Sequence, residues 1–322
     1  MQDLNVKILE ITGAKSIIRS ESVQRLWSGY GEIRRYYLKG GKYPSIIVKH
    51  IRLPNKPDHP KGWNTSLSHQ RKLTSYLVER KWYQNYTQQT NRCCRIPQCY
   101  YSIEEGNELL LIMEDLDASG YDIRVHHDQV SIDQAKVCLS WLAHFHATFM
   151  EVEPEGLWPV GTYWHLETRP EELESMQNDL LKSAAQMIDA HLTNAKYQTL
   201  VHGDAKLANF CFGATEVAAV DFQYVGKGCG MKDVAYFISS CFEEKDCEIF
   251  EMELLDHYFK KLEVTMDNTI DFQLVKKEWS ELYRYAWADF YRFLDGWSPG
   301  HWKMNDYSKK LTNQVIKELN EK

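Results

Sequence analysis

The segment VHGDAKLANF, Val201–Phe210, places an acid and an amide five residues apart. The acid is Asp204 and the amide is Asn209, and a second acid, Asp221, follows directly after Val-Ala-Ala-Val. The apolar run before Asp221 is typical of a buried strand, which would deliver this side chain to an open edge. A loop between Asp204 and Asn209 would let both side chains face one cleft. We therefore expect the three residues to share a site.

These three residue types suit the transfer of a phosphoryl group from a nucleotide. Such a reaction needs a carboxylate beside the attacking hydroxyl, oxygen ligands for magnesium, a cation for the phosphates and a backbone cradle over them. Asp204 is the candidate base. Asn209 and Asp221 supply the oxygen atoms that Mg²⁺ prefers, so we predict all three as catalytic and these two as metal ligands. A loop with a purely structural role is the competing interpretation, because short motifs also arise by chance.

HGDAKLAN followed by VDFQ resembles the catalytic and metal loops of the aminoglycoside phosphotransferase and choline kinase superfamily. Protein kinases usually carry arginine where Gly203 stands, so the glycine favours the branch that acts on small molecules. The chain is most similar to the ecdysteroid kinase-like, choline kinase-like subfamily, over nearly its whole length. The resemblance implies an α+β, protein-kinase-like fold of two lobes. It also implies an enzyme that uses ATP and Mg²⁺ to phosphorylate a hydroxyl group of a small molecule.

The order of expected elements agrees with two lobes of different class. Residues 24–40, 44–53 and 94–116 have the β-branched runs and turns of strands, whereas residues 66–88 lack Pro and Gly and favour a helix. Beyond Leu116 the pattern is mostly helical, with a capping box at Ser131 and Gln134 and one helix expected over 169–192. We predict an N-terminal, antiparallel-sheet lobe for the nucleotide over residues 1–115. Residues 116–322 would form the helical C-terminal lobe for catalysis and substrate.

The resemblance assigns further residues to the nucleotide. Lys49, in an apolar strand, matches the lysine that grips the phosphates, and Glu79 matches the helix glutamate that pairs with it. A solvated lysine and an exposed acid are the alternative. The glycine-containing loop and the linker between the lobes complete the expected ATP site, through Ser28, Gly29, Gly31, Met113, Glu114 and Leu116. For the glycine pair, a simple hairpin turn is a strong competing explanation.

Two further features of the C-terminal half leave alternatives open. Asp233 resembles the family acid that braces the catalytic loop, and it could also cap a helix. Aromatic residues gather near the end of the chain and could cage a quaternary ammonium, although helical spacing favours a core; they are Trp279, Tyr283, Tyr285, Trp287, Phe290, Tyr291, Phe293, Trp297 and Trp302. If they form a core, Asp289 and Arg292 face elsewhere and could reach the substrate.

Composition narrows the class of protein. The net charge of −7 argues against a nucleic-acid partner, no apolar run is long enough for a membrane span, and no obligate protein partner is evident. The cysteines have no zinc-site spacing and the first residues have no apolar signal segment, so we expect a cytoplasmic protein. An antibiotic phosphotransferase of the aminoglycoside type and an inactive nucleotide-binding regulator are the alternatives. The chain has few clustered acids that could bind a polycationic aminoglycoside, which disfavours the antibiotic phosphotransferase. The presence of Lys49, Asp204, Asn209 and Asp221 disfavours the inactive regulator.

Overall fold

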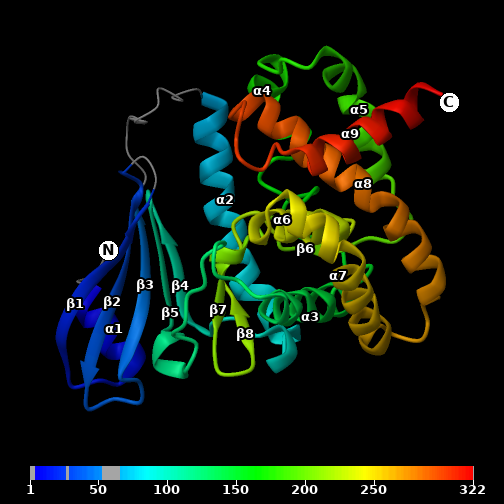
Figure 1. Cartoon of the computed structure of the whole chain (residues 1–322). Helices are drawn as coiled ribbons and strands as arrows, with labels where there is room; N and C mark the ends of the chain where they lie inside the picture. Colours follow the sequence, from blue (N-terminus) through cyan, green and yellow to red (C-terminus); the bar gives the residue numbers. More distant parts are fainter. Residues whose placement is uncertain (1–3, 27–28, 53–65, 322) are drawn as a thin grey trace.

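A five-stranded antiparallel sheet forms the N-terminal part of the fold (Figure 1). The computed structural model describes residues 4–26, 29–52 and 66–321. The sheet has the strand order β1-β2-β3-β5-β4. The strands are β1 (Ser16–Arg25), β2 (Gly31–Lys39), β3 (Ser45–Arg52), β4 (Cys99–Glu105) and β5 (Glu108–Glu114). The strands expected from the sequence are therefore present.

The two faces of this sheet pack against different helices, because successive side chains of a strand point to opposite faces. Ile46 and Val48 of β3 join a small core with α1 (Leu4–Thr12). Ile51 instead joins the large core that includes α2 (Ser66–Asn85). Lys49 lies two residues before Ile51 on the same strand, so its side chain points to the same face of the sheet, the face toward α2.

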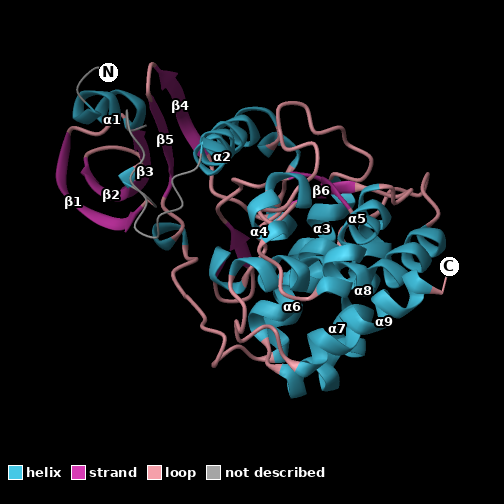
Figure 2. Ribbon diagram, turned by 90° about the horizontal axis from the view of Figure 1, so that it is seen from above, coloured by secondary structure: helices cyan, strands magenta, loops and turns pink. Residues whose placement is uncertain are grey.

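Helices dominate the rest of the chain (Figure 2). Two short two-stranded sheets pair β6 with β9 and β7 with β8. The strands are β6 (Thr199–Val201), β7 (Phe210–Phe212), β8 (Val217–Ala219) and β9 (Gly226–Gly228), and the helices are α3 (Ile132–Thr148), α4 (Pro170–Glu174), α5 (Asp179–Thr193), α6 (Met231–Cys241), α7 (Glu244–Thr265), α8 (Phe272–Trp297) and α9 (Asp306–Asn320). This two-lobed α+β arrangement confirms the predicted fold class. The exact boundary at residues 115 and 116 stays a prediction.

The single helix expected over 169–192 is wrong, because the chain breaks between α4 and α5. The carboxylate of Asp295, on α8, accepts hydrogen bonds from the backbone N–H groups of Gln177 and Asn178, at 2.8 and 2.9 Å. Asn178 then caps α5 by accepting from the N–H of Leu181. Residues 171–192 contain no Gly or Pro that would indicate the break. A partner more than a hundred residues away terminates the helix.

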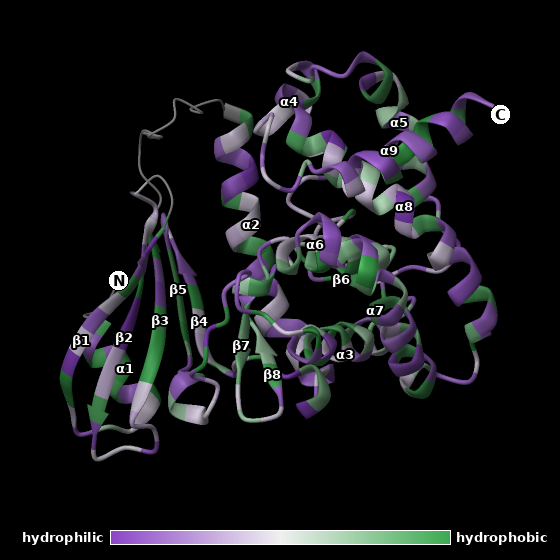
Figure 3. Cartoon of the chain, viewed as in Figure 1, coloured by the Kyte–Doolittle hydropathy of each residue, from purple (hydrophilic) through white to green (hydrophobic). Residues whose placement is uncertain are grey.

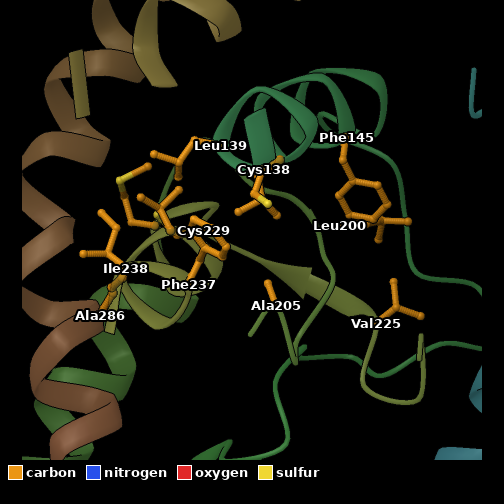
Figure 4. Packing of buried hydrophobic residues seen from close by; sticks show 14 of the residues in the cluster. Cys138, Leu139, Phe145, Leu200, Ala205, Val225, Cys229, Phe237, Ile238 and Ala286 are labelled. Carbon is orange, nitrogen blue, oxygen red and sulfur yellow. The ribbon is translucent and has the colours of Figure 1, made fainter. Parts of the chain in front are cut away.

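One hydrophobic core joins the two lobes. Trp82 of α2 stacks on Phe222, with ring centroids 4.7 Å apart, and lies 5.2 Å from Phe149. Helix α6 is buried over its whole length, and Figure 3 shows hydrophobic residues gathered on it. Ala205, next to Asp204, lies fully buried in this core (Figure 4). The loop that contains Asp204 is thus anchored in the packed interior.

Within the described residues, no helix combines the length and the apolar character that crossing a bilayer requires.

Candidate active site

The loop from His202 to Asn209 is held in place by a buried acid. Asp233, in the first turn of α6, accepts hydrogen bonds from the backbone N–H groups of His202 and Gly203, at 2.6 and 2.9 Å. Its carboxylate also contacts Nε2 of His146 at 3.1 Å. Asp233 therefore braces the loop, as the sequence resemblance implied. It does not cap the helix, since the N-cap of α6 is Gly230.

The carboxylate of Asp204 is oriented by three donors. Its Oδ2 accepts from Lys206 Nζ at 2.9 Å and from Asn209 Nδ2 at 3.1 Å, and its Oδ1 accepts from the hydroxyl of Tyr236 at 3.2 Å. The same Asn209 nitrogen also donates to the backbone carbonyl of Asp204, at 2.7 Å. Because both partners are acceptors, this atom must be the nitrogen. The amide oxygen of Asn209 is then available to a cation.

Asp221 follows β8 in a strained backbone conformation. Its φ is +70°, which a residue with a side chain rarely adopts, and such strain concentrates at functional sites. Its Oδ1 lies 3.7 Å from Lys49 Nζ and accepts a hydrogen bond from Gln223 Nε2 at 2.6 Å. Burial alone would raise the pKa of Asp221, but the ammonium groups of Lys49 and Lys72 hold it below its ordinary value. Asp221 is therefore an anion at neutral pH.

Lys49 and Glu79 form a buried ion pair between β3 and α2. Lys49 Nζ lies 2.6 Å from the Glu79 carboxylate, and each residue is about 2% exposed. Burial alone would lower the pKa of Lys49, but the carboxylates of Glu79 and Asp221 raise it above its ordinary value. Lys49 thus stays a cation beside Asp221. The solvated alternative for this pair is wrong.

A second link between α2 and Asp221 was not predicted. Gln223 donates to Asp221, and its Oε1 accepts from Lys72 Nζ at 2.8 Å and from Ser75 Oγ at 3.3 Å. No role was predicted for Gln223 from the sequence. The structure shows that this glutamine joins the helix to the proposed metal-binding acid.

One end of the cleft includes the end of β5 and the segment that follows it. Met113, Glu114 and Leu116 line the cleft. The Glu114 carboxylate pairs with Arg95 and accepts from Ser119. The backbone N–H of Glu114 donates to Gln98, and the carbonyl of Leu116 accepts from Ser119 and Tyr121. The nucleotide role of these three residues stays a prediction.

The prediction that Gly29 and Gly31 belong to the ATP site has weaker support. Gly29 and Gly31 are not among the residues that line the cleft. The N–H of Leu26 donates to the carbonyl of Gly31 at 2.9 Å, which closes the turn between β1 and β2. A side chain at Gly31 would collide with the backbone of His50. The turn explains both glycines, and Ser28 lies outside the described residues.

One cleft of about 820 Å³ brings Lys49, Asp204, Asn209 and Asp221 together, with Glu79 at its wall. Aromatic rings line its other end. Phe290 and Phe293 belong to the group that could have formed either a cage or a core, whereas no site was predicted for Tyr163, Tyr224 and Tyr236. We call these five residues the aromatic floor.

The floor is continuous with the catalytic loop. Tyr163 donates its backbone N–H to the carbonyl of Gly203 at 3.1 Å, and its ring lies 5.7 Å from Tyr236 and 5.9 Å from Tyr224. Phe290 lies 4.8 Å from Tyr236, and Phe293 lies 5.4 Å from Tyr163. An acceptor molecule on this floor would therefore lie next to Asp204.

The expectation that Asp289 and Arg292 could reach a substrate is wrong. Both are fully buried and bind each other, with 2.6 Å between the guanidinium and the carboxylate. Asp289 also accepts from the indole of Trp164 at 2.9 Å. Trp287 is core, as the helical spacing favoured, but Trp297 and Trp302 line the cleft.

The sequence matches the ecdysteroid kinase-like family over residues 69–156 and 160–274, which is more than half of the chain. This match confirms the resemblance inferred from the catalytic-loop motif. No curated protein matches the sequence.

Solved structures with the same fold include small-molecule kinases. Amicoumacin kinase hAmiN, in complex with AMP-PNP, Ca2+ and Ami, gives a TM-score of 0.57 at 14% identity, over 99% of this chain and 93% of its own. Choline kinase from Cryptosporidium parvum Iowa II gives 0.53 at 11% identity, over 95% and 89%. Choline kinase LicA from Streptococcus pneumoniae gives 0.52 at 13% identity, over 99% and 98%. At these identities the likeness shows the fold.

Proposed function

We propose that this chain, which belongs to the ecdysteroid kinase-like family, transfers the γ-phosphoryl group of ATP to a hydroxyl group of a small molecule. The observation that carries the proposal is the convergence of Lys49, Asp204, Asn209 and Asp221 on one cleft. These residues come from β3, the catalytic loop and the segment after β8. Their types are those that phosphoryl transfer uses for the phosphates, the acceptor and the metal.

Asp204 would act on the acceptor. Its carboxylate orients the attacking hydroxyl and takes its proton as the new O–P bond forms, while the bond between the γ-phosphorus and the ADP oxygen breaks. Lys206 and Tyr236 hold this carboxylate from either side. The Lys206 ammonium, 2.9 Å from Asp204, would also stabilise negative charge that develops beside this carboxylate during transfer.

The donor set fits a magnesium ion. Asn209 presents an amide oxygen and Asp221 a carboxylate, and the described residues contain no cluster of three or more His, Cys, Asp or Glu side chains that could form an all-protein cage. Mg²⁺ is usually bound by one or two protein ligands together with substrate phosphates. When bound there, it would neutralise charge on the phosphate oxygens.

Lys49 would hold the phosphates of the nucleotide from the other lobe. The Glu79 carboxylate fixes its flexible ammonium at 2.6 Å, which reduces the ordering needed when the nucleotide binds. The complex of amicoumacin kinase with AMP-PNP and Ca2+ supports this pairing of a nucleotide with a divalent ion in the same fold.

A mutation of Asp204 tests the proposal. An acceptor is first identified by ADP release from the wild-type protein with ATP, Mg²⁺ and a panel of alcohols, amino alcohols, sterols and hydroxy acids. Asp204→Asn should then lower turnover of the best acceptor by roughly 100-fold or more, because general-base catalysis contributes about that much. Calorimetry should show that AMP-PNP still binds.

Asp256→Asn is the matched control, since Asp256 is an exposed acid on α7 outside the cleft. Turnover by Asp204→Asn at the rate of this control would contradict the role of Asp204. A wild-type protein that does not bind Mg–AMP-PNP would overturn the proposed function.

A further inference from the structure

Lys303 adds a positive charge to the acceptor end of the cleft. Lys303, in the segment between α8 and α9, lines the cleft. Its Nζ lies 4.6 Å from the ring centroid of Tyr236 and 5.4 Å from that of Phe290. Among the described residues, no carboxylate forms an ion pair with Lys303. The rings beside it interact weakly with cations, and Asp204, which acts on Lys303 only as a nearby charge, is already bound by other donors.

Two arginines extend this charge along the floor. The Arg169 guanidinium lies 5.2 Å from the Phe293 ring and pairs with Glu172 at 2.9 Å. Arg71 donates to the backbone carbonyl of Thr168 at 2.7 Å and, within the described chain, has no carboxylate partner. Burial and the neighbouring Arg169 lower the pKa of Arg71. The like charges of Arg71 and Arg169 repel each other, and a bound anion beside them would reduce that repulsion.

The acids of the cleft lie elsewhere or are already engaged. Asp204 is bound by Lys206, Asn209 and Tyr236. Asp221 faces Lys49 at the proposed metal site. A cationic acceptor would find no free carboxylate beside the aromatic floor, and the ring faces of Tyr236 and Phe290 already hold an ammonium group.

We propose, on the premise of the phosphoryl transfer proposed above, that the acceptor is a planar apolar alcohol that also carries an anionic group such as a carboxylate. Its ring rests on the aromatic floor, its hydroxyl meets Asp204 and its anionic group binds Lys303. This substrate class differs from the quaternary ammonium of choline and from a polycationic aminoglycoside. Both would bring a cation against an unpaired lysine.

The geometry also sets the size of a suitable probe. Tyr236 donates its hydroxyl to Asp204 at 3.2 Å, and the face of its ring holds Lys303 Nζ at 4.6 Å. The position expected for the acceptor hydroxyl, beside Asp204, is thus separated by about the width of one aromatic ring from the position expected for the anionic group, beside Lys303. A benzene ring with para substituents spans this separation.

The test compares three benzyl alcohols whose para groups are an anion, a neutral amide and a cation. They are 4-(hydroxymethyl)benzoate, its neutral carboxamide, and 4-(aminomethyl)benzyl alcohol as the cation. Binding to the protein saturated with Mg–AMP-PNP is measured by calorimetry, which needs no turnover. We expect the benzoate to bind about tenfold or more tighter than the amide, as for a charge-assisted hydrogen bond, and the cation to bind most weakly.

Two variants of Lys303 and one control complete the experiment. Lys303→Met keeps the apolar stem on the rings and should make the benzoate and the amide bind equally. Lys303→Glu should reverse the order of benzoate and cation. Lys309→Met, an exposed lysine on α9, should keep the wild-type order.

The possible results distinguish failure of this inference from failure of the proposed function. Equal binding of the three probes by the wild-type protein, or no detectable binding of the benzoate, would overturn the inference. An equal loss of all three probes in Lys303→Met would overturn it too, because Lys303 would then serve the shared ring or the phosphates. Failure of the proposed function is recognised separately, as absence of Mg–AMP-PNP binding before any probe is added.

Discussion

Gly203 shows how one residue fixes the geometry of the catalytic loop. Its φ is +78°, in the left-handed region, and a Cβ there would collide with the backbone carbonyl of Tyr224. Its N–H is bound by Asp233. A glycine is therefore required next to Asp204 both for the backbone conformation and for the close approach.

Gly203→Ala should destabilise the protein and impair the site. The left-handed conformation alone costs an alanine roughly 1–2 kcal/mol, and the collision with Tyr224 adds to this. Gly120→Ala is the matched control, because Gly120 has a φ of +88° with nothing within 4 Å of its Cβ position. Urea unfolding should give a clearly larger loss for Gly203→Ala, and equal losses would contradict the collision.

The protonation of Lys303 should make recognition of an anion depend on pH. Burial lowers its pKa to about 8, so it is a cation at pH 7 and loses its proton as the pH rises through about 8. The charged and titratable groups around it are Asp204, Lys206, Tyr236, Cys241 and His301.

Binding of 4-(hydroxymethyl)benzoate should therefore weaken between pH 7 and pH 9, whereas binding of the neutral amide should stay flat over this range. Calorimetry at several pH values measures both. A benzoate affinity that does not fall as the pH rises would contradict the role of a cationic Lys303.

At the scale of elements, α2 is connected to the proposed metal site by two separate links. Glu79 acts through Lys49, and Lys72 and Ser75 act through Gln223. Both links end at Asp221, at 3.7 and 2.6 Å. The position of this helix therefore determines how the Asp221 carboxylate is oriented, which makes Gln223 a positioning residue.

Gln223→Ala should weaken Mg²⁺ binding to the nucleotide-loaded protein by about tenfold, because hydrogen bonds to charged groups are worth about 1.5–3 kcal/mol. A titration of Mg²⁺ against nucleotide binding measures this directly. Lys72→Met should have a smaller effect in the same direction. Gln70→Ala, an exposed glutamine on α2, is the control, and a metal affinity for Gln223→Ala equal to that of this control would disprove the link.

At the scale of the whole molecule, the two lobes share one core. Trp82 of α2 packs on Phe222 and Phe149 of the helical lobe. Residues of both lobes also line the cleft, so its ligands would touch both lobes through Lys49 and Asp221. Because the core is shared, we expect the lobes to unfold together.

Thermal unfolding followed by far-UV circular dichroism and by tryptophan fluorescence should therefore show one coincident transition. Mg–AMP-PNP at 100 times its Kd should stabilise the folded state by about 2.7 kcal/mol. Asp221→Asn should remove the part of this stabilisation that requires Mg²⁺. Two separate transitions would contradict the shared core, and an unchanged Mg²⁺ effect would contradict the metal-binding role of Asp221.

Tertiary structure decided those features whose partners are distant in the chain. The break between α4 and α5 depends on Asp295, the second link to Asp221 depends on Lys72, and the acceptor end joins Tyr163 to Lys303. Only the position of Lys206 inside the motif could have pointed to its role. No local sequence pattern predicts the contacts made by Asp295, Lys72, Tyr163 and Lys303. Each of these residues, taken by itself, is compatible with a solvated surface or an ordinary core.

The sequence by itself predicted the class of the fold and the set Asp204, Asn209 and Asp221, and the resemblance to a known family added Lys49. Strand and helix periodicity, and the spacing within the loop that holds Asp204, could be used because they are properties of neighbouring residues. The folded chain decided which of its many aromatic and cationic side chains meet at the acceptor end. The charge of that end depends on which carboxylates are already paired, and pairing is settled only when distant segments pack together.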